Sequence, residues 1–202
     1  MRKILVLFCV SIMSYAAPAL AFTGVSIGGK VGYANYTGDI LPASGDVGSS
    51  VLYGAVLEMA TFPILDFELH VNYFSKDLTY TFDPGTGPVS GTFEFRDVHV
   101  LALAKKNLIS APMSPLGLYV GGGLGWHLIN TELAQALVGN PALSGVDLFS
   151  NSVKASGHGL LGVRVSPPVF PLAVYGEARF GRIFAADGIN TTEIEGGVML
   201  KF

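Results

Sequence analysis

The stretch INTTEIEGGVMLKF, residues 189–202, alternates between two kinds of side chain from Glu193 onward. One parity is apolar or glycine: Ile194, Gly196, Val198, Leu200 and Phe202. The other parity is mostly polar: Glu193, Glu195, Gly197, Met199 and Lys201. A period of two is typical of a β-strand with one apolar and one polar face. A soluble β-sandwich would give the same pattern, but an apolar end without a polar tail suits a strand that faces lipid.

This stretch resembles the last strand of the small outer-membrane β-barrel proteins of Gram-negative bacteria, the OmpX, OmpW and opacity-protein group. In that family, a terminal phenylalanine preceded by apolar residues at alternate positions is the signal that the barrel-assembly machinery recognises. Phe202, Leu200, Val198 and Ile194 match this signal, and Gly196 stands where a bulky residue is usual. The resemblance implies a location in the cell outer membrane, with its lipid, lipopolysaccharide and the assembly machinery as partners.

Residues 1–21 have the features of a secretory signal peptide. Two basic residues precede a short apolar run, and small residues lie just before Phe22, where we predict cleavage. The run is shorter than the about 18 to 20 apolar residues of a transmembrane helix. Cys9, the only cysteine, lies in this segment. We therefore expect the mature chain, residues 22–202, to be one barrel domain without disulfides or a lipid anchor.

The composition is apolar and mildly acidic. Half of the residues are hydrophobic, 13% are charged, and twelve basic against fifteen acidic residues give a net charge of −3. Loss of the two basic residues of the signal peptide would leave ten against fifteen, or −5. No basic patch indicates nucleic-acid binding. High hydropathy without a spanning helix beyond the signal segment favours a membrane β-barrel over a secreted β-sandwich.

Eight segments show the alternation of a strand. They cover residues 24–36, 51–61, 65–74, 92–105, 116–129, 153–165, 172–184 and 189–202. The clearest is 65–74, where Asp66, Glu68 and His70 share one parity and therefore cannot face hydrocarbon. An even number of strands is expected of a closed bacterial barrel. The sequence thus predicts an all-β fold, an eight-stranded antiparallel transmembrane up-and-down β-barrel.

The lengths of the connections agree with this topology. If the first strand begins in the periplasm, the extracellular connections are 37–50, 75–91, 130–152 and 185–188, and the periplasmic ones are 62–64, 106–115 and 166–171. Long loops then fall mostly outside and short turns mostly inside, as in outer-membrane barrels. The aromatic residues expected on the lipid side, as a girdle near the headgroups, are Tyr33, Tyr53, Tyr73, Trp126 and Phe180.

The inward parity carries charges of both signs. Its polar residues include Lys30, Glu58, Glu68, His70, Asp97, His99, His158, Arg164, Glu177, Arg179 and Glu195. Over the whole inward set, six cations against seven anions indicate mutual pairing rather than an ion-selective pore. An eight-stranded barrel is just wide enough for its own side chains to fill it, and unpaired charges inside it are costly. We therefore expect a salt-bridged core without a wide channel; a narrow or gated path is the alternative, because interior glycines remove side-chain volume.

All four histidines fall on inward parity in the middle strands: His70, His99, His127 and His158. With Glu68 or Asp97 as a further ligand, such a set could form a metal or proton-relay site. Imidazoles are equally good interior hydrogen-bonding groups, and the stagger between strands is not visible in the sequence. We therefore expect no metal and no cofactor.

Ser156, His158 and Glu177 supply the side chains of a hydrolytic triad. The serine and histidine point into the barrel by alternation, and no surrounding motif specifies a triad. We expect no catalytic site and no enzymatic activity.

The longest connection, 130–152, is unusually apolar and contains Leu133, Leu137 and Phe149. Exposed apolar loops contact a partner, a ligand or the barrel mouth as a lid. We expect a non-enzymatic outer-membrane barrel with a structural or surface-interaction role, whose outer loops contact a host or envelope protein. The alternative is a narrow channel or conduit for small hydrophobic molecules, similar to the OmpW branch.

Overall fold

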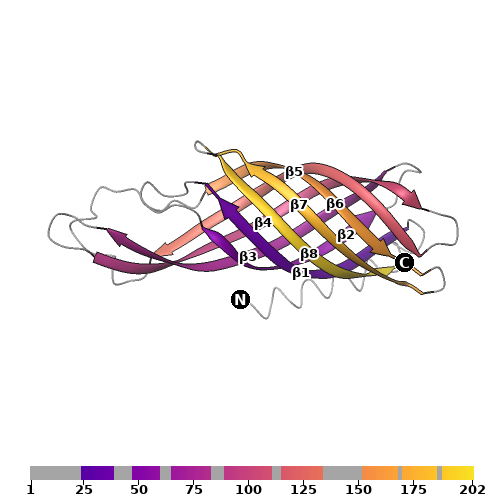
Figure 1. Ribbon diagram of the computed structural model, residues 1–202, viewed down its shortest axis with the longest axis horizontal. Helices are drawn as coiled ribbons and strands as arrows, with labels where there is room; N and C mark the ends of the chain where they lie inside the picture. Colours follow the sequence, from indigo (N-terminus) through magenta and orange to yellow (C-terminus); the bar gives the residue numbers. More distant parts are fainter. Residues whose placement is uncertain are drawn as a thin grey trace.

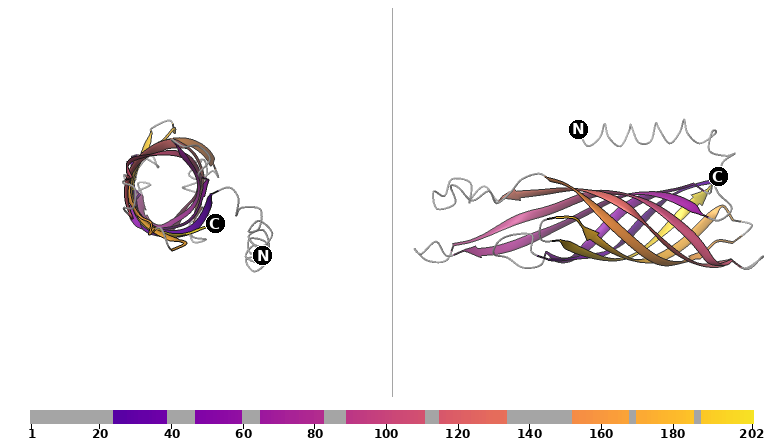
Figure 2. Two further views of the ribbon diagram at one scale, coloured as in Figure 1. Left: turned by 90° about the vertical axis from the view of Figure 1, so that its right-hand side faces the viewer. Right: turned by 90° about the horizontal axis from the view of Figure 1, so that it is seen from above.

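The computed structural model describes residues 24–38, 47–59, 65–82, 89–110, 115–133, 152–167, 170–185 and 188–202. Its strands are β1 (Val25–Thr37), β2 (Gly48–Met59), β3 (Asp66–Phe82), β4 (Val89–Ser110), β5 (Leu116–Leu133), β6 (Ser152–Val165), β7 (Leu172–Ile183) and β8 (Ile189–Lys201). Each strand pairs antiparallel with its sequence neighbours, and β8 returns to β1. The sheet is a closed up-and-down barrel, seen from the side in Figure 1 and along its axis in Figure 2. This confirms the predicted fold. The described residues contain no helix long and apolar enough to cross a membrane.

The seam between the first and last strands completes the barrel. Pairing of β1 with β8 runs from Ser26 opposite Lys201 to Thr37 opposite Asn190. The backbone N–H of Phe202 then donates to the carbonyl of Val25 at 2.9 Å. Closure satisfies the backbone groups that an open sheet would leave at its edges, which a strand in lipid requires.

The strand ends differ from the prediction at the end of the barrel away from the C-terminus. The segment 75–91, predicted as a loop, is largely a hairpin that continues β3 and β4 from Ser75 opposite Arg96 to Phe82 opposite Val89. In Figures 1 and 2 these two strands extend well beyond the rest of the barrel. Strand β5 also runs past its predicted end there, to Leu133, while β4 runs past its predicted end at the opposite end of the barrel, to Ser110. The prediction was wrong here because a hairpin outside the hydrocarbon needs no apolar face, so the alternation that marks a lipid-facing strand fades.

The two faces of the sheet separate as the alternation predicts. The large apolar side chains that point outward remain exposed, among them Ile194, which is 68% exposed. The five predicted lipid-side aromatic residues, Tyr33, Tyr53, Tyr73, Trp126 and Phe180, all lie on this outer face. Such an apolar exterior around a polar interior is the arrangement of a barrel whose solvent is lipid.

Inward-facing glycines make room for large side chains from neighbouring strands. A Cβ added to Gly162 would lie 2.4 Å from Cζ of Tyr119, and one added to Gly197 would lie 2.6 Å from the Tyr175 ring. Each tyrosine therefore packs directly on the backbone of the adjacent strand. In a barrel this narrow, glycine is the residue that lets two such side chains fit inside.

We predict that Gly162→Ala destabilises the barrel by about 1–3 kcal/mol, because the added methyl group overpacks the site beneath Tyr119. Gly159→Ala is the matched control: Gly159 lies on the same strand but points outward, with nothing within 4 Å of an added Cβ. Urea unfolding in detergent, followed by heat-modifiable gel migration, gives both values. Equal midpoints for the two variants would contradict this packing.

Candidate functional site

The end of the barrel interior away from the C-terminus is closed by an apolar plug. We give this name to Ala34, Tyr36, Val47, Leu52, Phe74, Phe95, Ile129, Ile183 and Ile189, which form one buried cluster. The ring centroids of Tyr36 and Phe74 lie 4.6 Å apart, and those of Phe74 and Phe95 lie 6.0 Å apart. All three aromatic side chains have no exposed surface. The plug thus seals the end at which β1 finishes.

A histidine layer lies next to the plug and is centred on Asp97. Its Oδ2 accepts a hydrogen bond from the Tyr36 hydroxyl at 2.5 Å and lies 3.0 Å from His99 Nδ1 and 2.7 Å from His127 Nδ1. His99 and His127 are direct partners across β4 and β5, so their rings stack with centroids 4.5 Å apart.

The layer continues through β6. Ser156 Oγ lies 3.0 Å from His127 Nε2 and 2.7 Å from His158 Nε2. The His158 ring stacks on that of His127 at 5.8 Å. Three of the four histidines therefore converge, which the sequence alone left open because it does not give the stagger of the strands.

An ion-paired network centred on Arg179 fills the middle of the barrel. Its guanidinium lies 2.6 Å from Glu195, 2.9 Å from Glu193 and 3.0 Å from Glu177. Lys30 also pairs with Glu195, at 2.8 Å. Because these groups are buried, each charge depends on its partner for stabilisation.

Lys105 and His70 extend this network toward the other end. Lys105 pairs with Glu68 at 2.6 Å and with Glu177. His70 Nε2 lies 2.6 Å from Glu68, and its Nδ1 lies 2.6 Å from the Lys30 ammonium. The network therefore joins side chains from strands on opposite sides of the barrel.

Arg164 lies at the mouth near the chain termini. It pairs with Glu58 and, at 3.3 Å, with Glu68. Its side chain is 16% exposed. The described interior is therefore occupied from the plug to this mouth, first by apolar, then by hydrogen-bonded and then by ion-paired side chains.

The structure places the predicted interior residues on the inner face. Buried there are Lys30, Glu58, Glu68, His70, Asp97, His99, His158, Glu177, Arg179 and Glu195, with Arg164 half-buried. Phe202 lies at the β1–β8 seam with its side chain 40% exposed. Leu133 pairs with Phe93 through the backbone, and Leu137 and Phe149 lie outside the described residues, as do residues 1–23.

The three side chains considered as a triad do not come together. Glu177 contacts Lys105, Tyr119 and Arg179, whereas Ser156 lies in the histidine layer. The hydrogen-bonded chain that does form runs from Ser156 through His127 to Asp97. Ser156 has no exposed surface. Tyr36 and Asn72 complete the layer, and both share the inward parity of their strands.

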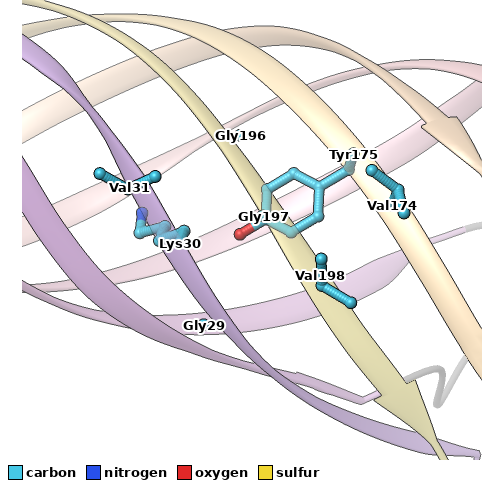
Figure 3. A pocket seen from close by; sticks show the side chains of 8 residues that line it. All are labelled: Gly29, Lys30, Val31, Val174, Tyr175, Gly196, Gly197 and Val198. Atoms are coloured by element: carbon cyan, nitrogen blue, oxygen red, sulfur yellow. The ribbon is translucent and has the colours of Figure 1, made fainter.

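The outer wall carries a shallow hollow across β1, β7 and β8 (Figure 3). Its volume is about 650 Å³, and its lining includes Gly29, Gly196, Gly197, Val31, Val174 and Val198. Gly29 and Gly196 lack side chains on the outward parity, so the neighbouring valines form its rim. Lys30 and Tyr175, which point inward, complete its lining.

The fold is that of small outer-membrane barrels. Neisserial surface protein A is 16% identical, with a TM-score of 0.59 over 89% of this chain and 98% of that chain. The N-terminal β-barrel domain of Pseudomonas aeruginosa OprF is 12% identical, with a TM-score of 0.53 over 89% and 98%. Ail, the attachment invasion locus protein of Yersinia pestis, is 11% identical, with a TM-score of 0.50 over 89% and 99%. The sequence matches no protein-family model and no curated protein. At the level of the fold, the resemblance predicted from the sequence is confirmed.

We predict that Arg179→Met destabilises the barrel by about 3–5 kcal/mol, because three buried carboxylates lose a shared cation. Arg182→Met is the matched control, since Arg182 lies on the same strand with an exposed side chain, and surface changes are usually within about 0.5 kcal/mol. Urea unfolding in detergent measures both. A midpoint for Arg179→Met equal to that of the control would show that the network contributes no stability.

Proposed function

We propose that this protein is an integral barrel of the cell outer membrane that carries out no chemistry and presents its outer strands and loops at the cell surface. The observation that carries this proposal is the filled interior: the apolar plug, the histidine layer and the ion-paired network leave no described opening through the barrel. A barrel that neither conducts nor exposes a reactive group acts through its exterior.

The positions of the C-terminus and of the β3–β4 hairpin support one orientation of the barrel in the membrane. Both the start of β1 and the C-terminus lie at one end of the barrel, opposite the β3–β4 hairpin (Figure 1). With the termini in the periplasm, Phe202 is placed where the assembly machinery would read it. The hairpin and the outer loops then extend from the outer leaflet, where lipopolysaccharide surrounds the barrel.

The β3–β4 hairpin is a surface element whose backbone pairing is described up to Phe82 opposite Val89. Strand β2 pairs with β3 only as far as Leu52 opposite Phe74, so residues 75–82 continue beyond that neighbour. Hydrogen bonds from Arg96 and Ser75 to Glu94 hold the base of the hairpin and keep the pKa of Glu94 at about 2. A hairpin held by backbone pairing and these hydrogen bonds loses less conformational entropy on binding a partner than a flexible loop does.

The charge pattern of this surface favours a protein as the partner of the hairpin. Lys76 and Asp77 on β3 lie near Glu94 and Arg96 on β4, so charges of both signs alternate. Among proteins of this fold, Ail was solved in complex with the heparin analogue sucrose octasulfate. For the present chain, a mixed-sign hairpin is poorly matched to a uniformly anionic polymer and better matched to a host or envelope protein.

Neither competing function gains support from the described residues. A conduit for hydrophobic molecules needs a path where the plug lies, and residues Leu137 and Phe149 of its predicted pocket lie outside the described part of the chain. An enzyme needs a reachable nucleophile, and Ser156 is buried in the histidine layer.

The test removes the surface elements and leaves the barrel. One variant replaces residues 79–92 with an Asn-Gly turn, a second shortens 134–151, and a control replaces the periplasmic residues 111–114 with a Gly/Ser linker of equal length. In a laboratory Gram-negative host, all three are expected to insert, as judged by heat-modifiable migration and surface proteolysis. Adherence to host cells, or detergent resistance of the envelope, is expected to fall for the first two variants only.

Full retention of adherence and detergent resistance in both outer variants would contradict a surface role. Failure of either outer variant to insert, while the periplasmic control inserts, would instead assign the hairpin or loop to barrel assembly.

A further inference from the structure

Asp97 differs from every other buried carboxylate in the described part of the chain. Each of the others has a lysine or arginine partner: Glu58 with Arg164, Glu68 with Lys105, Glu177 with Lys105, Glu193 with Arg179 and Glu195 with Lys30. Among the described residues, the Asp97 carboxylate has polar contacts only with the Tyr36 hydroxyl and the imidazoles of His99 and His127. A buried carboxylate without a cation is costly, so this position calls for a positive charge. A divalent cation next to Asp97 would supply the positive charge that this buried carboxylate lacks.

The groups around Asp97 are those that bind a transition metal. Asp97, His99 and His127 each offer one ligand atom, and these atoms all lie within 4.8 Å of one another. Two imidazole nitrogens with a carboxylate oxygen form a common three-residue set for zinc and other divalent transition metals. The Tyr36 hydroxyl, 2.5 Å from Asp97 Oδ2, is in place as a fourth ligand and second oxygen. The second carboxylate oxygen, Oδ1, is buried and has no hydrogen-bond partner among the described residues.

The hydrogen-bond partners of the second ring nitrogen, Nε2, of both imidazoles also suit a metal site. When Nδ1 of a histidine binds a metal, Nε2 carries the proton and needs an acceptor. His127 Nε2 lies 3.0 Å from Ser156 Oγ, whose hydroxyl can then donate to His158 Nε2 at 2.7 Å. His99 Nε2 lies 2.7 Å from the Asn72 amide.

The Asn72 amide can serve as that acceptor. Its Oδ1 has no hydrogen-bond partner among the described residues in the present orientation. A half-turn of the amide about its Cβ–Cγ bond presents the oxygen to His99.

We propose that Asp97, His99 and His127 bind one divalent transition-metal ion, of the zinc class, beneath the apolar plug, with Tyr36 as the additional oxygen ligand. The ion joins β4 to β5 directly and to β1 through Tyr36, and it enters while the barrel folds, because the folded site is buried. Its role is structural: it balances the charge of Asp97 and fixes the outer end of the barrel.

His70 provides the matched comparison. It also lies within ligand distance of two carboxylates, Glu177 and Glu195. There the cationic positions are already occupied, since the Lys30 ammonium and the Arg179 guanidinium lie 2.6 Å and 3.1 Å from His70 Nδ1. His70 therefore belongs to an ion-paired network that needs no metal.

The experiment uses the barrel purified in detergent after refolding with EDTA, with Zn²⁺ or with Co²⁺, followed by dialysis. Elemental analysis is expected to find one equivalent of metal in the wild type and in His70→Gln, and a loss of bound metal in His99→Gln and His127→Gln. The cobalt form of the wild type is expected to show the visible absorption bands of a nitrogen- and oxygen-ligated site. Asn72→Leu, which removes the acceptor for His99, is expected to weaken metal affinity about 10- to 100-fold.

The cobalt spectrum of the wild type keeps the proposal testable even if the histidine variants do not fold. Absence of bound metal and of cobalt bands in folded wild type would overturn it and would assign the charge next to Asp97 to a protonated imidazole. Metal retained by both His99→Gln and His127→Gln would also overturn it, because binding would then lie elsewhere.

Discussion

The narrow interior of an eight-stranded barrel is the constraint on which the rest of this structure depends. Such a barrel has room for side chains and little else, so every inward residue must fit its neighbours in volume and in charge. Glycine opposite tyrosine, as at Gly162 and Tyr119, satisfies the first requirement. Arg179, shared by three carboxylates, satisfies the second. The outer face of the same closed wall is apolar, which suits a barrel surrounded by lipid.

The order of the interior along the barrel axis has consequences for function. The plug lies between one mouth of the barrel and the hydrogen-bonded and charged groups, most of which are buried. These groups interact with one another, and their interactions stabilise the barrel. On the proposed function, contact with the surroundings is made by the lipid-facing wall and by the β3–β4 hairpin with its neighbouring loops.

The alternation of apolar and polar side chains predicted the fold well because it can be read within each strand separately. The parity of residues such as Glu68 and His70 is visible in the sequence and is enforced by the cost of a charge in hydrocarbon. The assembly of the histidine layer was not predictable in this way. It depends on the stagger that places His99 opposite His127 and brings Tyr36 of β1 to Asp97 of β4, and stagger is set by the whole barrel. The hairpin beyond Phe74 was missed for a different reason, because strands outside lipid lose the apolar face on which the prediction relied.

The central claim is that the interior of this barrel is closed, and planar-bilayer conductance of the refolded protein tests it most directly. The account predicts no steady ion conductance from protein whose insertion is shown independently by heat-modifiable migration. Steady single-channel conductance of inserted protein would contradict it, because the plug and the ion-paired network would then have to leave a continuous aqueous path.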